Sequence, residues 1–109
     1  MSEAVDGSVV PMGGLCPQRR FTVRGRVQGV GFRWWTQREA CARNLVGSVW
    51  NRDDGAVEIV AGGEAFFLDA FADRLREGPP AARVEVIEVE PVVPGSISVP
   101  TSFEIVRTP

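Results

Sequence analysis

The residue types best suited to chemistry lie in one segment, Gly25-Arg-Val-Gln-Gly-Val-Gly-Phe-Arg33. Glycines at 25, 29 and 31 let the backbone curl so that several N–H groups point inward. A concave set of N–H donors binds anions, and the N-terminus of a following helix adds partial positive charge. Arg33 can offer a planar guanidinium to two phosphate oxygens at once. The segment therefore predicts a site for one tetrahedral dianion.

Two other glycine signatures contain similar residues, and neither fits this segment. A Walker A loop needs Gly-Lys-Ser/Thr, and this chain contains no lysine. The dinucleotide fingerprint is Gly-x-Gly-x-x-Gly, whereas the spacing here is Gly-x3-Gly-x-Gly. On residue chemistry alone, a glycine-rich turn with Arg33 solvated at a helix start fits about equally well, because short glycine motifs recur by chance.

The composition removes several common kinds of catalysis. The 109 residues include no histidine, and all 12 basic residues are arginines. A histidine base, a Schiff-base lysine and a P-loop lysine are therefore excluded. Cys16 and Cys41 are too few and too far apart for a zinc site, so we expect no metal and no cofactor. The net charge of −2 gives no general attraction to nucleic acid or to anionic membranes.

A second polar candidate, Asn51, ends a short β-type run before the turn Arg52-Asp-Asp-Gly55. Its position alone favours a turn-capping residue over a catalytic one by about two to one. Asp53 and Asp54 can be read as a carboxylate pair for magnesium. Adjacent carboxylates in a short turn are far more often turn residues, and this is the interpretation we favour.

Hydrophobic alternation and turn signals predict the elements that must position these residues. Their order is strand Arg20–Arg24, helix Phe32–Arg43, strands Val46–Asn51 and Ala56–Ala61, helix Glu64–Glu77, strand Arg83–Glu90 and strand Ser102–Arg107. A change of apolar phase after Val86 indicates a bulge in the strand Arg83–Glu90. Pro91 is expected to end this strand. Trp34 and Trp35 lie about 100° apart on their helix, so one can pack inward while the other is partly exposed.

The order of elements predicts an α+β, ferredoxin-like fold, βαββαβ with a C-terminal strand added. In it, two helices pack on one face of an antiparallel sheet. Residues 1–18 are predicted to be a flexible N-terminal tail and residues 19–109 the folded domain. No apolar run is long enough to span a membrane, and the acidic N-terminus lacks the features of a signal peptide. We therefore expect a cytoplasmic protein without a membrane partner.

Two ordered motifs in these elements resemble those of the acylphosphatase family. Gly25–Arg33 is similar to the family signature, and Gly47-Ser-Val-Trp-Asn51 with Asp54-Gly55-x-Val57 is similar to its second motif. The resemblance continues through Gly78-Pro-Pro80 and Arg83-Val84 to Phe103-x-Ile105, and covers about residues 20 to 107. Within it, Arg43 departs from the usual aliphatic residue on the inward helix face, and we expect its head to reach solvent at some cost in packing.

The resemblance implies a hydrolase that cleaves acyl phosphates, small molecules in which a carboxylate and phosphate form a mixed anhydride. It implies that Arg33 binds the substrate phosphate together with loop N–H groups, and that Asn51 orients the attacking water. The implied phosphate-binding residues are Arg26, Val27, Gln28, Gly29, Val30, Gly31, Phe32 and Arg33. The protein is expected to act as a monomer, with no metal or cofactor.

Two other functions compete with hydrolysis. A nucleic-acid-binding module of this fold places aromatic residues on the central strands, and Ala56–Ala61 has none. A non-catalytic module that binds an anion or carbamoyl phosphate keeps the fold and the loop without turnover. Catalysis by the isolated chain separates this last alternative from the enzyme.

Overall fold

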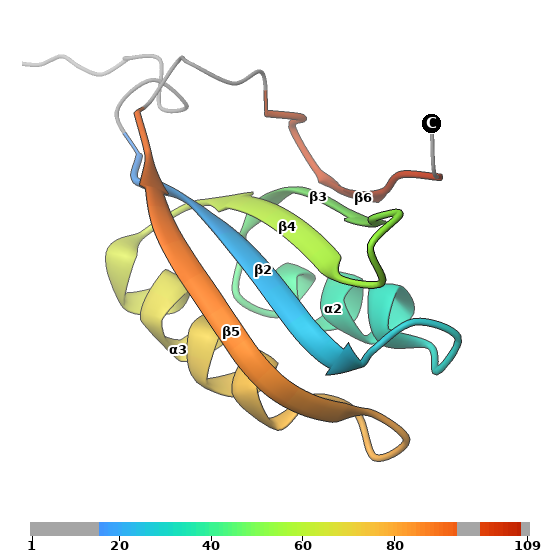
Figure 1. The fold of residues 1–109 in the computed structure, drawn as a ribbon. Helices are drawn as coiled ribbons and strands as arrows, with labels where there is room; N and C mark the ends of the chain where they lie inside the picture. The colour runs from blue at the N-terminus through green and yellow to red at the C-terminus, as the bar shows by residue number, and fades with distance from the viewer. Residues whose placement is uncertain (1–15, 94–98, 108–109) are drawn as a thin grey trace, which may run out of the picture.

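The computed structural model of the chain describes residues 16–93 and 99–107. Its elements, labelled as in Figure 1, are β2 (Gln18–Arg26), α2 (Phe32–Cys41), β3 (Val46–Asn51), β4 (Val57–Gly62), α3 (Ala65–Glu77), β5 (Arg83–Val92) and β6 (Phe103–Ile105). The first strand begins at Gln18, while most of the predicted tail, residues 1–15, lies outside the described residues. Neither helix in the described ranges is long and apolar enough to cross a membrane.

The strands form one sheet in the order β5-β2-β4-β3-β6. The pairs β2–β4, β2–β5 and β3–β4 are antiparallel, and the added strand β6 runs parallel to β3. The first four strands thus have the order expected of a ferredoxin-like fold, and the predicted fold class is confirmed. The C-terminal strand makes the five-stranded sheet mixed.

Both helices cover the same face of the sheet (Figure 1). Phe21 of β2 is fully buried there and meets the ring of Phe71 of α3 edge to face, with 5.5 Å between centroids. Phe71 in turn lies 6.3 Å from Phe103, the first residue of β6. Helix α2 buries Phe32, Trp35, Thr36 and Ala40 against this layer. One aromatic and aliphatic core therefore fixes both helices relative to the strands.

The bulge and the end of β5 differ in detail from the expectation. Arg24 faces Val86 and Gly25 faces Val84, so Glu85 is the extra residue, slightly earlier than predicted. A Cβ on Gly25 would lie 2.1 Å from the carbonyl oxygen of Arg83, so only glycine fits this pairing. The expectation that Pro91 ends the strand is wrong, since Pro91 pairs with Arg19 inside β5. As an edge strand, β5 can accommodate a residue without an N–H.

Candidate active site

The glycine loop joins the end of β2 to the start of α2, and buried side chains anchor both of its ends. Val27 and Phe32 are each 1% exposed. Between them, Gly29 and Gly31 adopt left-handed backbone angles, with φ of 76° and 78°. A Cβ at either glycine would meet nothing within 4 Å, so the backbone there borders open space. The loop is therefore anchored at its ends, while its backbone at Gly29 and Gly31 borders open space.

The N–H groups of this loop are available to a ligand. Within residues 16–93 and 99–107, none of the N–H groups of residues 28–34 donates to another residue. Gly31 is the N-cap of α2 and has no side chain that could cap the helix. The first helical turn also contains no acidic residue. The partial positive charge of the helix N-terminus is thus not neutralised locally. Both features suit the binding of an anion.

Arg33 lies in this first turn and is half-buried. Among the described residues it makes no ion pair and no hydrogen bond through its side chain. Arg24, Arg52 and Arg74, in contrast, each contact a carboxylate within 3.2 Å. The guanidinium of Arg33 therefore keeps its donors available for a ligand such as a phosphate.

Asn51 is the last residue of β3 and pairs with Val57 in the sheet. It lies on the same sheet face as the buried Val49, the face covered by the helices. Its Oδ1 atom is buried without a hydrogen-bond partner among the described residues. A buried amide oxygen without a partner costs free energy, so this atom is poised to accept a hydrogen bond from water or substrate.

A cavity of about 90 Å³ brings Arg33 and Asn51 together. Its lining residues are Val27, Gly29, Gly31, Phe32, Arg33, Trp34 and Asn51. The space holds several water molecules, and thus a small anion. The glycine loop and the β3–β4 hairpin meet at this end of the sheet (Figure 1). Two motifs separated in the sequence therefore face one another.

Three of the predicted phosphate-binding residues are not among the cavity's lining residues. Arg26 is exposed at the end of β2, and Val30 packs against the hydrophobic core. The side chain of Gln28 turns to the hairpin, where its Nε2 donates to the carbonyl oxygens of Arg52 (2.8 Å) and Ala56 (3.0 Å). Gln28 therefore joins the loop to the turn that follows Asn51. No local sequence pattern predicts this role of Gln28.

The carboxylates of the hairpin are engaged in the turn and its ion pairs. The Ala56 N–H donates to Oδ1 of Asp54, and Arg24 and Arg52 lie 3.2 and 3.1 Å from its Oδ2. The hydrogen bond from Ala56 lowers the pKa of Asp54, with a further contribution from Arg24. Within the described ranges, no group of three histidine, cysteine or acidic residues is arranged to hold a metal ion.

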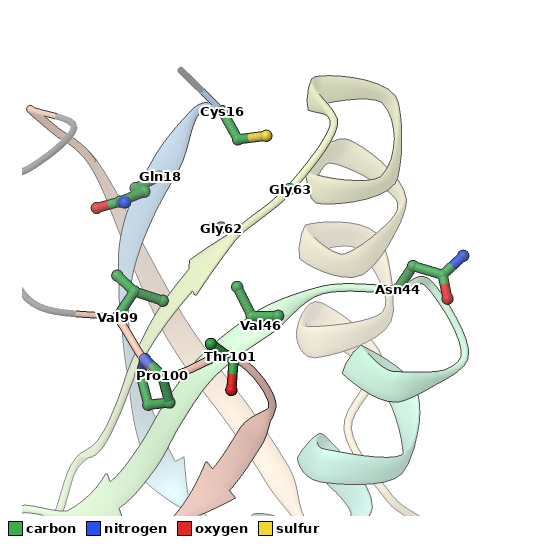
Figure 2. Close-up of a pocket in the computed structure, with 9 residues that line it drawn as sticks. All are labelled: Cys16, Gln18, Asn44, Val46, Gly62, Gly63, Val99, Pro100 and Thr101. Atoms are coloured by element: carbon green, nitrogen blue, oxygen red, sulfur yellow. The ribbon is translucent and has the colours of Figure 1, made fainter. Parts of the chain in front are cut away.

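A larger cavity, of about 340 Å³, lies at the opposite end of the sheet (Figure 2). It is bordered by the starts of β2 and β3, the end of β4 and the segment before β6. The described residues that line it carry no charge: Cys16, Gln18, Asn44, Val46, Gly62, Gly63, Val99, Pro100 and Thr101. Because an anion needs positive groups or aligned N–H donors, the smaller cavity is the better candidate for phosphate chemistry.

Fold and site together define an α+β domain in which a glycine loop, an arginine and a facing asparagine line one small cavity suited to an anion. The family model described as Acylphosphatase matches residues 19–105. Across 77 residues the chain is 53% identical to an acylphosphatase of Nitrobacter hamburgensis, covering 68% of this chain and 75% of the relative. The chain belongs to the acylphosphatase family.

Solved structures agree with this assignment. The crystal structure of acylphosphatase from Bacillus subtilis superposes with a TM-score of 0.77 at 44% identity, covering 83% of this chain and 98% of that one. Full-length HypF, in a phosphate- and nucleotide-bound form, matches with a TM-score of 0.74 at 32% identity. That match covers 84% of this chain but 12% of HypF, so the same fold also occurs as a small part of a much larger protein.

Proposed function

We propose that this acylphosphatase hydrolyses acyl phosphates with Arg33 and the loop N–H groups binding the phosphoryl group and Asn51 orienting the attacking water. One observation carries this assignment of roles. The guanidinium of Arg33 and the Oδ1 of Asn51, both without a partner in residues 16–93 and 99–107, line the same small cavity beside N–H groups that are likewise unbonded there. Donors for the phosphate and an acceptor for water are thereby supplied together.

The reaction needs little more than these groups. Water attacks phosphorus, the bond from phosphorus to the acyl oxygen breaks, and the carboxylate leaves with the electron pair. Since a carboxylic acid has a pKa of about 4, the leaving group needs no general acid. In a loose transition state the water needs orientation more than deprotonation, and its proton passes to a phosphate oxygen. The protein contributes positioning and electrostatic stabilisation.

Further features of the proposal concern the setting in which the enzyme works. We place it in the cytoplasm as a monomer that uses no metal or cofactor and binds neither nucleic acid nor a membrane. The net charge of −2 supports the last point, because it offers no general attraction to polyanions. Size-exclusion chromatography with light scattering tests the monomer, and a dimer would contradict it.

Hydrolysis of benzoyl phosphate, followed by ultraviolet absorbance with a chelator present, tests the proposed roles. Arg33→Ala and Asn51→Ala should each lower kcat/KM by about 10²-fold or more, since each removes a preorganised transition-state contact. Arg38→Ala is the matched control, because Arg38 is exposed on the same helix and does not line the cavity. Full activity in either site variant would refute the role of that residue.

The substrate class supplies a second test of the mechanism. Alkyl phosphate monoesters expel an alkoxide, and the proposed site has no acid to protonate it, so they should be nearly inert. Efficient hydrolysis of ethyl phosphate would contradict the mechanism. A folded wild-type chain that binds inorganic phosphate but turns over no acyl phosphate would favour the non-catalytic module.

A further inference from the structure

The side chain of Trp34 has no evident role in holding the fold. It is 67% exposed, although a tryptophan gains much stability when buried. Its neighbour Trp35 anchors the helix instead. Trp35 is 7% exposed, packs 5.4 Å from the ring of Phe32, and has Arg74 5.5 Å above its own ring. The exposed indole of Trp34 therefore calls for a different explanation.

Trp34 stands directly beside the groups assigned to the phosphate. It follows Arg33 in the first turn of α2 and lines the same cavity as Asn51. The other apolar lining side chains, Val27 and Phe32, are almost completely buried, and Gly29 and Gly31 offer no side chain. Trp34 is thus the lining residue with an extensive apolar surface open to solvent.

The groups that line the cavity determine where the rest of a substrate must lie. In the proposed function the phosphoryl group occupies the cavity of about 90 Å³, among Arg33, the glycine loop and Asn51. The leaving oxygen departs roughly opposite the attacking water, so the acyl group must extend from the cavity across its rim. An aromatic or long apolar acyl group crossing that rim can stack on the indole of Trp34 and remove apolar surface from water.

We propose that Trp34 is a specificity-determining residue that contacts the acyl group and favours acyl phosphates with aromatic or extended apolar acyl groups. The inference rests on the proposed function, since it needs the phosphoryl group to occupy the Arg33 cavity. The indole acts on the part of the substrate that differs between acyl phosphates. The loop and Arg33 act on the phosphate that all of them share.

The test compares benzoyl phosphate with acetyl phosphate in four proteins: wild type, Trp34→Ala, Trp34→Phe and Phe66→Ala. The quantity measured is the kcat/KM for benzoyl phosphate divided by that for acetyl phosphate. Differences in intrinsic reactivity cancel when a variant's ratio is divided by that of wild type. Phe66 is the matched control, because it is 73% exposed on α3 and does not line the cavity.

We expect Trp34→Ala to lower the ratio between about twofold and tenfold, the range of a lost aromatic contact. Trp34→Phe should retain most of the ratio, and Phe66→Ala should leave it unchanged. An unchanged ratio in Trp34→Ala, or an equal loss on both substrates, would overturn the inference while hydrolysis itself persisted. Absence of turnover on both substrates in wild type would instead remove the proposed function, and the inference with it.

Discussion

Arginines occupy two different environments along helix α2. At its N-terminus, Arg33 faces a cavity and has no carboxylate partner among the described residues. Further along, Glu39 accepts hydrogen bonds from Arg43 at 2.9 Å and from Arg74 of α3 at 3.0 Å. Within the described part of the chain the first guanidinium keeps its donors for a ligand, whereas the other two join α2 to the segment that follows it and to α3. The difference lies in the neighbouring carboxylates, not in the residue type.

The paired cluster also explains a departure from the family pattern. Arg43 was expected to send its head to solvent at a cost in packing. Its Nη1 instead donates to the carbonyl oxygen and to Oε1 of Glu39, at 2.9 Å each. The hydrogen bond from Arg74, with the charges of both arginines, lowers the pKa of Glu39. Arg43 therefore pairs its Nη1 within the protein, in a position where the family resemblance implies an aliphatic residue.

Giving Arg33 a carboxylate partner would make the two environments alike. Asn51→Asp should do so and should lower kcat/KM by at least about 10²-fold, because the carboxylate repels the phosphate and competes with it for Arg33. Steady-state kinetics should show a larger rise in KM than in Asn51→Ala, which removes the amide without adding charge. Equal kinetics in the two variants would mean that no charge competition occurs at Arg33.

Loosening the connection between loop and hairpin should have the next largest effect. Gln28→Ala removes the two hydrogen bonds to the hairpin, so Asn51 loses its alignment with Arg33. We expect kcat to fall roughly tenfold with little change in KM, since misplacement by a fraction of an ångström weakens transition-state contacts. Single-turnover measurements on benzoyl phosphate give the chemical step directly.

A matched control exists for this variant. The Nε2 of Gln37 also donates to a backbone carbonyl, that of Phe103 at 3.0 Å, but it joins α2 to β6. Gln37→Ala should cost a similar amount of stability, about 1 kcal/mol for a lost hydrogen bond, and leave kcat nearly unchanged. A parallel fall of kcat in both variants would show that general destabilisation, not alignment, is responsible.

Removing a paired arginine should separate stability from activity. Arg74→Ala breaks the contacts with Glu39, Glu77 and Trp35, and should lower Tm by a few degrees while leaving kcat/KM nearly unchanged. Arg33→Ala should show the reverse, since Arg33 has no such contacts with the described residues to lose. Thermal unfolding and benzoyl phosphate kinetics on both variants measure this contrast. A loss of activity in Arg74→Ala would contradict it.

The smallest effect concerns acid stability. The folded-state pKa of Glu39 lies below its ordinary value of 4.5. Its contribution to stability is thus fully present above that value and is lost as the pH falls through the folded pKa. Glu39→Gln should be less stable than wild type at pH 7, and the difference should shrink below about pH 4. Thermal unfolding of both proteins across pH 3–7 measures this stability difference. A difference that stays constant with pH would contradict the link between the pKa of Glu39 and stability.

Much of the local structure was predictable because its signals are local. The predicted strand Val46–Asn51 agrees with β3 residue for residue. Alternation, glycine spacing and turn residues act over a few positions, so the chain's own order reveals them. The same holds for Trp34 and Trp35, whose angular separation on the helix predicted that only one would be buried.

The contacts that complete the site were not readable in this way. The bonds of Gln28 reach residues 24 and 28 positions away, and the Glu39–Arg74 pair spans 35. Even within β5, the pairing with Gly25 decided where the bulge lies. Such contacts depend on how distant segments return to one another, which periodicity along the chain does not encode.

The sequence by itself thus determined the elements, their order, and the residue types at the phosphate loop. Only the tertiary structure decided which of those groups remain unpaired and face one cavity. Arg33 and Arg74 carry the same guanidinium, and no local pattern distinguishes them. The distinction arises because folding places Glu39 beside one arginine and an open, N–H-lined cavity beside the other.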